Sequence, residues 1–137
     1  MSYLLIADDD LDDCFLAEEA WRETRLPVES RFVHDGASLI RTLESQQNTP
    51  DLILLDLNMP IMDGRETLKA LKTNKKTSTI PVVILSTTHQ EEDIRKVYAL
   101  GANSFIRKPN SYTDFVNIME TIAGYWFNTV VLPVPQQ

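Results

Sequence analysis

One segment limits the possible folds of this chain more than any other: residues 51–64, Asp-Leu-Ile-Leu-Leu-Asp-Leu-Asn-Met-Pro-Ile-Met-Asp-Gly. Its four apolar residues have the length of a buried strand, end on the carboxylate of Asp56, and are followed at once by a turn signal. A second apolar run, Tyr3–Ala7, leads directly into three acids at residues 8–10. If the two strands are neighbours, four carboxylates share one corner and repel one another unless a cation binds. Oxygen-rich clusters suit Mg²⁺, so a magnesium site is predicted there.

Strand-like and helix-like patterns alternate along the rest of the chain. The expected strands are Tyr3–Ala7, 28–32, Leu52–Leu55, Val82–Leu85 and Ser104–Ile106. Apolar residues recur at helical spacing in each intervening segment and again over 115–126. This (βα)₅ order predicts an α/β protein, a doubly wound parallel five-stranded sheet with helices on both faces.

In such sheets, ligands bind beyond the carboxyl ends of the strands. The acids Asp8, Asp9 and Asp56 follow strands one and three, Ser86 lies at the end of strand four, and Lys108 follows strand five. A carboxylate can act as a nucleophile and accept a phosphoryl group, a reaction that needs mainly positioning and charge neutralisation. We therefore expect Asp56 to be the acceptor, Mg²⁺ to be held by the three acids, and Ser86 and Lys108 to contact phosphoryl oxygens. The backbone carbonyl of Asn58 is a candidate further metal ligand.

These residues resemble the receiver domain of two-component response regulators, and the resemblance covers nearly the whole chain. It is carried by the acids after strand one, by Leu-Leu-Asp-Leu-Asn-Met-Pro and Asp-Gly in 54–64, by Ile-Pro-Val-Val-Ile-Leu-Ser in 80–86, and by Lys108-Pro109. The resemblance implies a flavodoxin-like sheet of strand order 2-1-3-4-5. It also implies phosphorylation of Asp56 by a histidine kinase or a histidine phosphotransfer protein.

The same resemblance assigns further roles. Asp8 and Asp9 would hold Mg²⁺, with the Asn58 carbonyl as another ligand, and the Lys108–Pro109 peptide would be cis. Ser86 stands where the family has a switching hydroxyl, although a shift of one residue would give that role to Thr87. Phe105 stands where the family has a switching aromatic, and it lacks the hydroxyl of a tyrosine. Within the family, the chain is most similar to stand-alone receivers paired with bacterial phytochrome-type kinases.

The chain is expected to divide into a receiver domain at 1–127 and a C-terminal tail at 128–137. The apolar ending, from Trp126 to Val134, either folds back on the body or covers a partner surface. We expect it to support a homodimer built on the fourth helix, the fifth strand and the fifth helix. With no room for an output domain, output is expected through a downstream protein target or by phosphate relay.

Two other functions fit part of the pattern. A phosphohydrolase of the haloacid dehalogenase type also uses an aspartate nucleophile, Mg²⁺ and a lysine. That chemistry needs a second acid two residues after the nucleophile, where this chain has Asn58. A scaffold that binds partners without phosphorylation would have no reason to keep all five site residues. We therefore expect a signalling switch rather than an enzyme that turns over a substrate.

Composition excludes several other classes. The net charge of −7 argues against direct DNA binding. No run of 18 apolar residues predicts a membrane span, and no signal peptide is recognisable at the start, so a cytoplasmic protein is expected. Cys14 is the only cysteine and should be an inert thiol beside a helix face.

For several polar residues the expected roles are structural. Asp10, Asp12 and Asp13 are expected to be surface or cap acids in the first turn of a helix. Asp63-Gly64 reads as a turn and helix start. His34 and His89 are expected at the surface, Lys72, Lys75 and Lys76 in a solvated loop, and Trp21 in the core or at a helix edge.

Overall fold

The computed structural model describes residues 2–45 and 48–133 and has the predicted (βα)₅ order. The strands are β1 (Tyr3–Ala7), β2 (Glu29–Val33), β3 (Leu52–Leu55), β4 (Val82–Ser86) and β5 (Ser104–Arg107). The helices are α1 (Leu11–Arg22), α2 (Gly36–Ser45), α3 (Gly64–Thr73), α4 (Glu91–Ala99) and α5 (Tyr112–Gly124). A short π-helical segment, η1 (Tyr125–Thr129), continues α5. Val134 and the last three residues lie outside the described residues.

All five strands are parallel and lie in the order β2-β1-β3-β4-β5, so the predicted fold class is confirmed. The three central strands are buried on both faces, which explains why their sequences are continuously apolar rather than alternating. The edge strands β2 and β5 are only partly buried.

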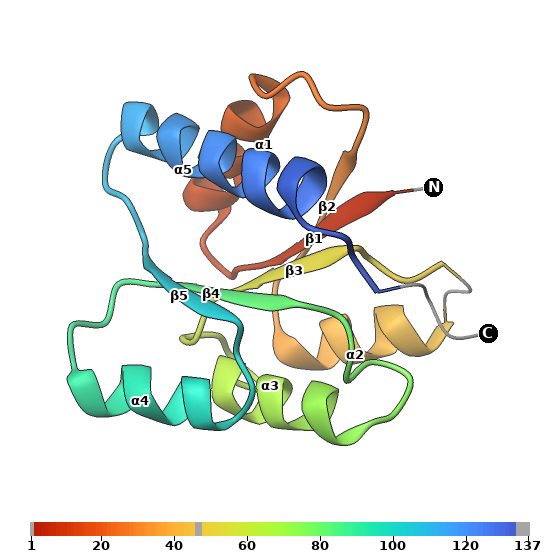
Figure 1. The fold of residues 1–137 in the computed structure, drawn as a ribbon. Coiled ribbons are helices and arrows are strands. Elements are labelled where there is room, and N and C mark those ends of the chain that lie inside the picture. Colours follow the sequence, from red (N-terminus) through yellow and green to blue (C-terminus); the bar gives the residue numbers. More distant parts are fainter. Residues whose placement is uncertain (1, 46–47, 134–137) are drawn as a thin grey trace.

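The helices form two layers, with α1 and α5 on one face of the sheet and α2, α3 and α4 on the other (Figure 1). Each layer closes a separate hydrophobic cluster. Alternate strand residues such as Leu5, Ile53 and Ile84 face α2, α3 and α4, and their neighbours Leu4, Leu54 and Val83 face α1 and α5. Side-chain alternation along the central strands therefore divides the core into two halves.

The apolar ending of the chain begins by folding back on the body. Trp126 and Phe127 pack against the cluster under α1 and α5, and the Phe127 ring meets the Trp21 ring edge-on with centroids 5.6 Å apart. Trp21 is buried, as expected, and its indole N–H donates to the carbonyl of Val28 over 2.8 Å. The side chain of Val131, in contrast, is 98% exposed.

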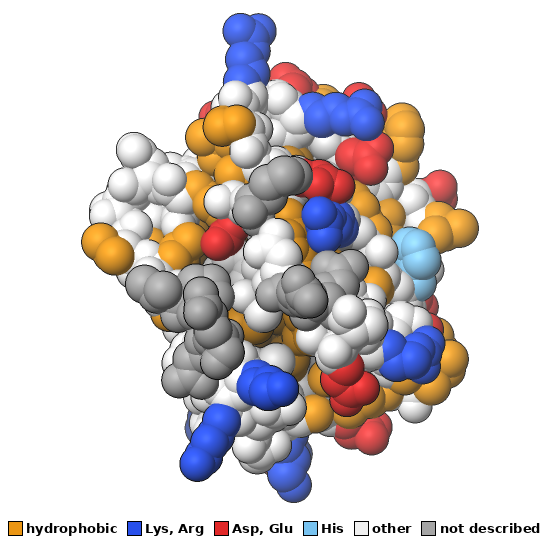
Figure 2. Space-filling model, turned by 90° about the vertical axis from the view of Figure 1, so that its right-hand side faces the viewer, with side chains coloured by type: hydrophobic (Ala, Val, Ile, Leu, Met, Phe, Trp, Pro, Cys, Tyr) orange, Lys and Arg blue, Asp and Glu red, His pale blue; other side chains and the backbone are white. Residues whose placement is uncertain are grey.

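Further along, Pro133 lines a small pocket with Pro50, Asp51 and Ile80. These residues precede β3 and β4, so the tail reaches the end of the sheet opposite to the strand tips that carry the acids. On this side of the molecule, side chains of both charges are interspersed with single hydrophobic ones (Figure 2). Among the described residues, no helix is both long and apolar enough to span a bilayer.

Candidate phosphoryl-acceptor site

Backbone bonds at the strand tips fix where the predicted site residues lie. The Asp8 amide donates to the carbonyl of Val33 (3.0 Å), the Asp56 amide to that of Ala7 (3.0 Å), and the Lys108 amide to that of Ser86 (2.8 Å). Each of these bonds continues a strand pairing by one step beyond the last strand residue. The first residue after each of these strands is therefore held as rigidly as the sheet itself.

Three carboxylates converge at this edge of the sheet. Asp8, Asp9 and Asp56 each offer an oxygen within 4.8 Å of the others. Asp56 is only 6% exposed and Asp8 is also buried, whereas Asp9 is exposed. Hard oxygen donors at this spacing, two of them shielded from water, fit a divalent cation such as Mg²⁺ or Mn²⁺. The structure thus brings together the three acids for which a metal site was predicted.

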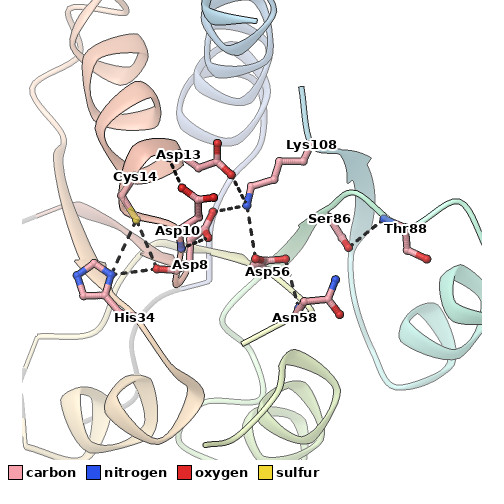
Figure 3. A network of polar contacts seen from close by, with 10 residues as sticks. All are labelled: Asp8, Asp10, Asp13, Cys14, His34, Asp56, Asn58, Ser86, Thr88 and Lys108. Carbon is pink, nitrogen blue, oxygen red and sulfur yellow. Dashed lines mark hydrogen bonds and ion pairs between the residues drawn. The ribbon is translucent and has the colours of Figure 1, made fainter. Parts of the chain in front are cut away.

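Lys108 supplies the positive charge of the pocket. It extends past Asp56 toward β1 and α1 (Figure 3). Its ammonium nitrogen lies 2.7 Å from Asp8 Oδ2, 2.8 Å from Asp13 Oδ2 and 3.5 Å from Asp56 Oδ2. Because the lysine side chain is buried, solvent screens these interactions weakly. The predicted lysine is therefore in the site, closer to two other acids than to Asp56.

The expected cis Lys108–Pro109 peptide is wrong. The described residues contain no cis peptide bond. The trans isomer is the more stable one for most bonds before proline. With the trans bond, the Lys108 ammonium lies within ion-pair distance of all three carboxylates.

The surroundings of the pocket raise two pKa values, each for a different physical reason. The pKa of Asp56 is raised from 3.8 to about 6, because burial and, to a smaller extent, the charge of Asp8 outweigh the opposing effects of Lys108 and of the Asn58 amide. Burial alone would lower the pKa of Lys108, but hydrogen bonds to Asp13 and Asp8 and the charge of Asp56 outweigh it and raise that pKa. Lys108 therefore stays charged, while Asp56 takes up a proton more readily than an ordinary aspartate does.

The loop after Asp56 is shaped by Gly64. A Cβ atom on this glycine would stand 2.4 Å from the Asp56 carbonyl oxygen and 2.6 Å from Leu57 Cα, so any side chain would displace the acceptor segment. The Gly64 amide donates to the Leu57 carbonyl over 2.9 Å. Asp63 caps α3 by accepting from the Glu66 amide. The predicted turn and helix start is confirmed, and it also holds the Asp56 backbone in place.

Of the two candidate hydroxyls after β4, Ser86 is buried and Thr87 is exposed. The Ser86 Oγ accepts a hydrogen bond of 3.3 Å from the Thr88 amide. Figure 3 shows Ser86 beside Asp56 in the site, with Asn58 on the side opposite to Lys108. Of the two, only the Ser86 hydroxyl is thus on the buried side of the strand end, and its role as switch hydroxyl stays a prediction.

A polar chain leads from Ser86 to the start of α4. The Thr88 hydroxyl donates to Asp93 Oδ2 over 3.3 Å, and the same carboxylate oxygen is 3.2 Å from the guanidinium of Arg65 on α3. Gln90, at the N-cap of α4, makes no side-chain capping bond. The first turn of α4 is therefore held by Thr88 and Arg65 instead of by its own cap.

Phe105 lies in β5, half-buried against the cluster under α2, α3 and α4. Its amide donates to the hydroxyl of Tyr98 on α4 over 3.1 Å. Because β5 is an edge strand, this amide would otherwise face away from the sheet. The candidate switch aromatic is thereby joined to α4 through its own backbone.

Asp13 is the site residue that sequence reasoning missed. It was expected to be a cap or surface acid, and Asp10 does act as the N-cap of α1, accepting from the Asp13 amide over 3.0 Å. The Asp13 side chain instead turns into the pocket and pairs with Lys108. One signal in the sequence could have identified Asp13. It lies in the first turn of the helix that follows the acid-bearing strand, and that turn lies over the strand tip.

Other expectations have mixed outcomes. Cys14 is buried, and burial is the main cause that raises the pKa of its thiol to about 12, which agrees with the prediction of an inert thiol. His34 is exposed but its Nδ1 lies 3.0 Å from the Asp8 carbonyl. Lys72 was wrongly assigned to a solvated loop. It lies in the last turn of α3, and its ammonium donates to the carbonyls of Ser78 and Ile80 between α3 and β4.

The fold and the site define a doubly wound α/β protein with an acidic pocket, a lysine and a buried hydroxyl at the carboxyl edge of its sheet. Residues 4–120 match the family model described as the response regulator receiver domain, and the chain belongs to that family.

Among curated proteins, the chain is similar to response regulator Rcp1 of a Synechocystis species, with 35% identity over 95% of this chain and 92% of that protein. A solved structure of the Mn²⁺-bound form of Rcp1 aligns with a TM-score of 0.88 and 34% identity, covering 96% of this chain and 99% of that one. The structure of the phosphorylated cyanobacterial phytochrome response regulator RcpA aligns with a TM-score of 0.91 and 35% identity, covering 96% and 98%. The predicted resemblance to phytochrome-linked receivers is thus confirmed.

Proposed function

We propose that this protein is a single-domain response regulator that is phosphorylated on Asp56 and signals through protein contacts. One observation carries the assignment: Asp56 is a buried carboxylate that lies within 4.8 Å of two further acids and 3.5 Å from a buried lysine. Clusters of buried charged groups with perturbed pKa values occur preferentially at functional sites. Family membership supplies the use, because response regulators receive phosphate from histidine kinases.

In the proposed reaction, an oxygen of the Asp56 carboxylate attacks the phosphorus atom of the donor. The new O–P bond forms as the bond from phosphorus to the donor nitrogen or oxygen breaks, and that bonding pair stays with the leaving group. The chain positions the nucleophile through the Asp56 amide bond to Ala7 and the close packing of Gly64. Lys108 and Ser86 offer the transferred group an ammonium and a hydroxyl.

We propose Mg²⁺ as the bound cation, held by Asp8, Asp9 and Asp56 with the Asn58 carbonyl as a further ligand. A divalent cation supplies neutralising charge for the carboxylates and for the phosphoryl oxygens. The acid spacing supports this assignment, as does the relative Rcp1, whose structure is described as Mn²⁺-bound. Competition between the two metals in a binding titration would distinguish them.

Signalling is proposed to follow from movement of Ser86 toward the phosphoryl group. Its hydroxyl would then turn from the Thr88 amide, and the chain through Thr88 and Asp93 links that change to α4. Phe105 would pack further inward and alter the surface of α4, β5 and α5. The contact between the Phe105 amide and Tyr98 lies on the same route.

The proposed partners are a histidine kinase or histidine phosphotransfer protein as donor and a downstream protein as target. A phytochrome-type kinase is the proposed donor class because RcpA is described as a cyanobacterial phytochrome response regulator.

A homodimer through α4, β5, α5 and the tail is proposed as well. The exposed side chains of Tyr98 and Val131 would contribute to the contact between the two copies. Trp126 and Phe127 would not, because they pack against their own chain. Sedimentation with and without phosphodonor would test it, and a monomer under both conditions would exclude it.

Phosphorylation is tested by incubating the protein with Mg²⁺ and acetyl phosphate and measuring its intact mass. We expect a gain of one phosphoryl group that requires the metal and is absent in Asp56→Asn. Asp12→Asn, which removes an exposed acid four residues from Asp8, is the matched control and should be phosphorylated as wild type is. No gain in wild type under any condition would contradict the proposal and favour phosphorylation-independent scaffolding.

A further inference from the structure

Asp13 makes one of the two shortest contacts of Lys108. Its carboxylate oxygen is 2.8 Å from the ammonium nitrogen, against 3.5 Å for the proposed acceptor Asp56. The Asp13 side chain is 26% exposed and the lysine side chain 7%, so the pair is partly shielded from solvent. Contacts of this length between partly buried charges are stronger than exposed surface ion pairs.

The backbone holds Asp13 in this position. Its amide is bonded to the N-cap side chain of Asp10, and the Cys14 amide donates to the Asp10 carbonyl, so the first turn of α1 is fixed at both residues. Figure 3 shows Asp13 on the α1 side of the pocket, with the Lys108 chain drawn past Asp56 toward it. Asp13 is not one of the three acids whose oxygens cluster at metal-binding distance.

We propose that Asp13 is a positioning residue that holds the Lys108 ammonium on the α1 side of the pocket and so keeps it from competing with a divalent cation. An ammonium and a metal ion neutralise the same carboxylates, and each weakens the binding of the other. Asp13 draws the ammonium toward α1 and leaves Asp56 the more weakly paired acid. The role assigned to the metal rests on the proposed function, whereas the pairing of Asp13 with Lys108 does not.

Removing the Asp13 charge has two consequences, and both weaken metal binding. The ammonium is released toward Asp8 and Asp56, where it opposes metal binding, and one nearby negative charge is lost. We therefore expect Asp13→Asn to weaken Mg²⁺ binding about three- to tenfold. This change is on the order of one to two interactions between closely spaced charges in a site that is partly accessible to water. Asp12→Asn removes an equal charge from the neighbouring exposed position and should weaken binding less than twofold.

The experiment is a metal titration of the unphosphorylated protein, with Mn²⁺ followed by electron paramagnetic resonance and Mg²⁺ measured by competition. It compares wild type, Asp13→Asn and Asp12→Asn, and it repeats the two substitutions in a Lys108→Met background. In that background the competitor is absent, so Lys108→Met should bind metal more tightly than wild type. Asp13→Asn should then have a clearly smaller effect than in the wild-type background, because only the loss of a nearby negative charge remains.

Three results would overturn the proposal: Asp13→Asn behaving as Asp12→Asn does in the wild-type background, Asp13→Asn tightening metal binding, or its full effect persisting in Lys108→Met. The last result would make Asp13 a direct ligand or a simple charge. Urea unfolding of each variant separates loss of fold from loss of binding. Because no phosphodonor is used, failure of Asp56 to accept phosphate in the separate mass measurement leaves this test intact.

Discussion

Asp56 is held in a position that is unfavourable for an ionised carboxylate. Burial and the charge of Asp8 raise its pKa to about 6, and the nearest positive charge is shared with Asp8 and Asp13. The free energy of unfolding must therefore be lower when Asp56 is ionised than when it is neutral. The residue that the proposed function needs is thus also one that weakens the metal-free fold.

Asp56→Asn is expected to stabilise the metal-free protein at pH 7 by about 1–3 kcal/mol, since the neutral amide has no charge to desolvate. The ordinary pKa is 3.8 and the folded value about 6, so the folded protein binds the Asp56 proton more tightly. Wild-type stability due to this group therefore falls as pH rises from about 4 through 6 and is constant above. Urea unfolding across this pH range should show the variant's advantage shrinking at low pH. An advantage independent of pH would contradict the explanation.

Ser86→Ala is expected to reduce the response of α4 to phosphorylation, because the buried hydroxyl that would meet the phosphoryl group is lost. Thr87→Ala, at the adjacent exposed position, is the matched control and should respond as wild type does. Amide exchange of α4 with and without acetyl phosphate measures the response. Equal effects of the two substitutions would show that the hydroxyl after β4 had been assigned wrongly.

Individual residues differ in how well their places could be predicted. Asp8, Asp56, Ser86 and Lys108 directly end or follow strands, so the parallel sheet alone brings them to one edge. Asp13 could not be assigned in this way, because an acid in a first helical turn has a sufficient local reason to be there. Its contact with Lys108 spans 95 positions and depends on how α1 lies over β1. Lys72 was missed for a similar reason, since its carbonyl partners lie in a turn whose path the sequence does not define.

Among the elements, α4 is the helix with the weakest local anchoring. It has a single buried residue, Val97, and no side-chain cap, so Asp93 provides much of what fixes its first turn. Helix periodicity was enough to predict that this helix exists and where it lies along the chain. The links to Thr88 and Arg65 were not predictable, because they join three elements that only the tertiary fold brings together.

Asp93→Asn should loosen the first turn of α4, because it removes the ion pair with Arg65 and weakens the bond from the Thr88 hydroxyl. Glu92→Gln is the control: it removes the same charge from the same turn, but its partner is the exposed Lys96 one turn along the helix. We expect several-fold faster amide exchange at the start of α4 for Asp93→Asn only, with a loss in global stability of less than about 1 kcal/mol. Equal exchange in the two variants would exclude Asp93 as the anchor.

The whole molecule is a sheet between two separate hydrophobic clusters, and among the described residues at the end of the chain, Trp126 and Phe127 pack against the cluster under α1 and α5. The apolar character of the tail predicted contact with something, but not with which surface. The structure shows that Trp126 and Phe127 complete the cluster under α1 and α5. The proposed boundary at residue 127 therefore places this aromatic pair with the receiver domain.

Phe127→Ala is expected to lower the free energy of unfolding by about 1–3 kcal/mol, because it removes the ring that packs edge-on against Trp21 in a partly buried site. Val131→Ala, at a position that is 98% exposed, should leave stability unchanged within about 0.5 kcal/mol. Urea unfolding of both variants tests the comparison. Similar losses in the two would mean that the tail stabilises the body through another contact.

The Tyr98 hydroxyl also bears on how the protein behaves when it is concentrated. Strands at the edge of a sheet offer unpaired backbone groups to which another chain can add, and this is a common start of aggregation. At the β2 edge, Glu29 and Arg31 place charge along the strand, whereas at β5 the Phe105 amide is occupied by Tyr98. If the proposed switch moved α4 so that Tyr98 was withdrawn, the Phe105 amide would be open to pairing with another chain, and activation would then also promote association through this edge.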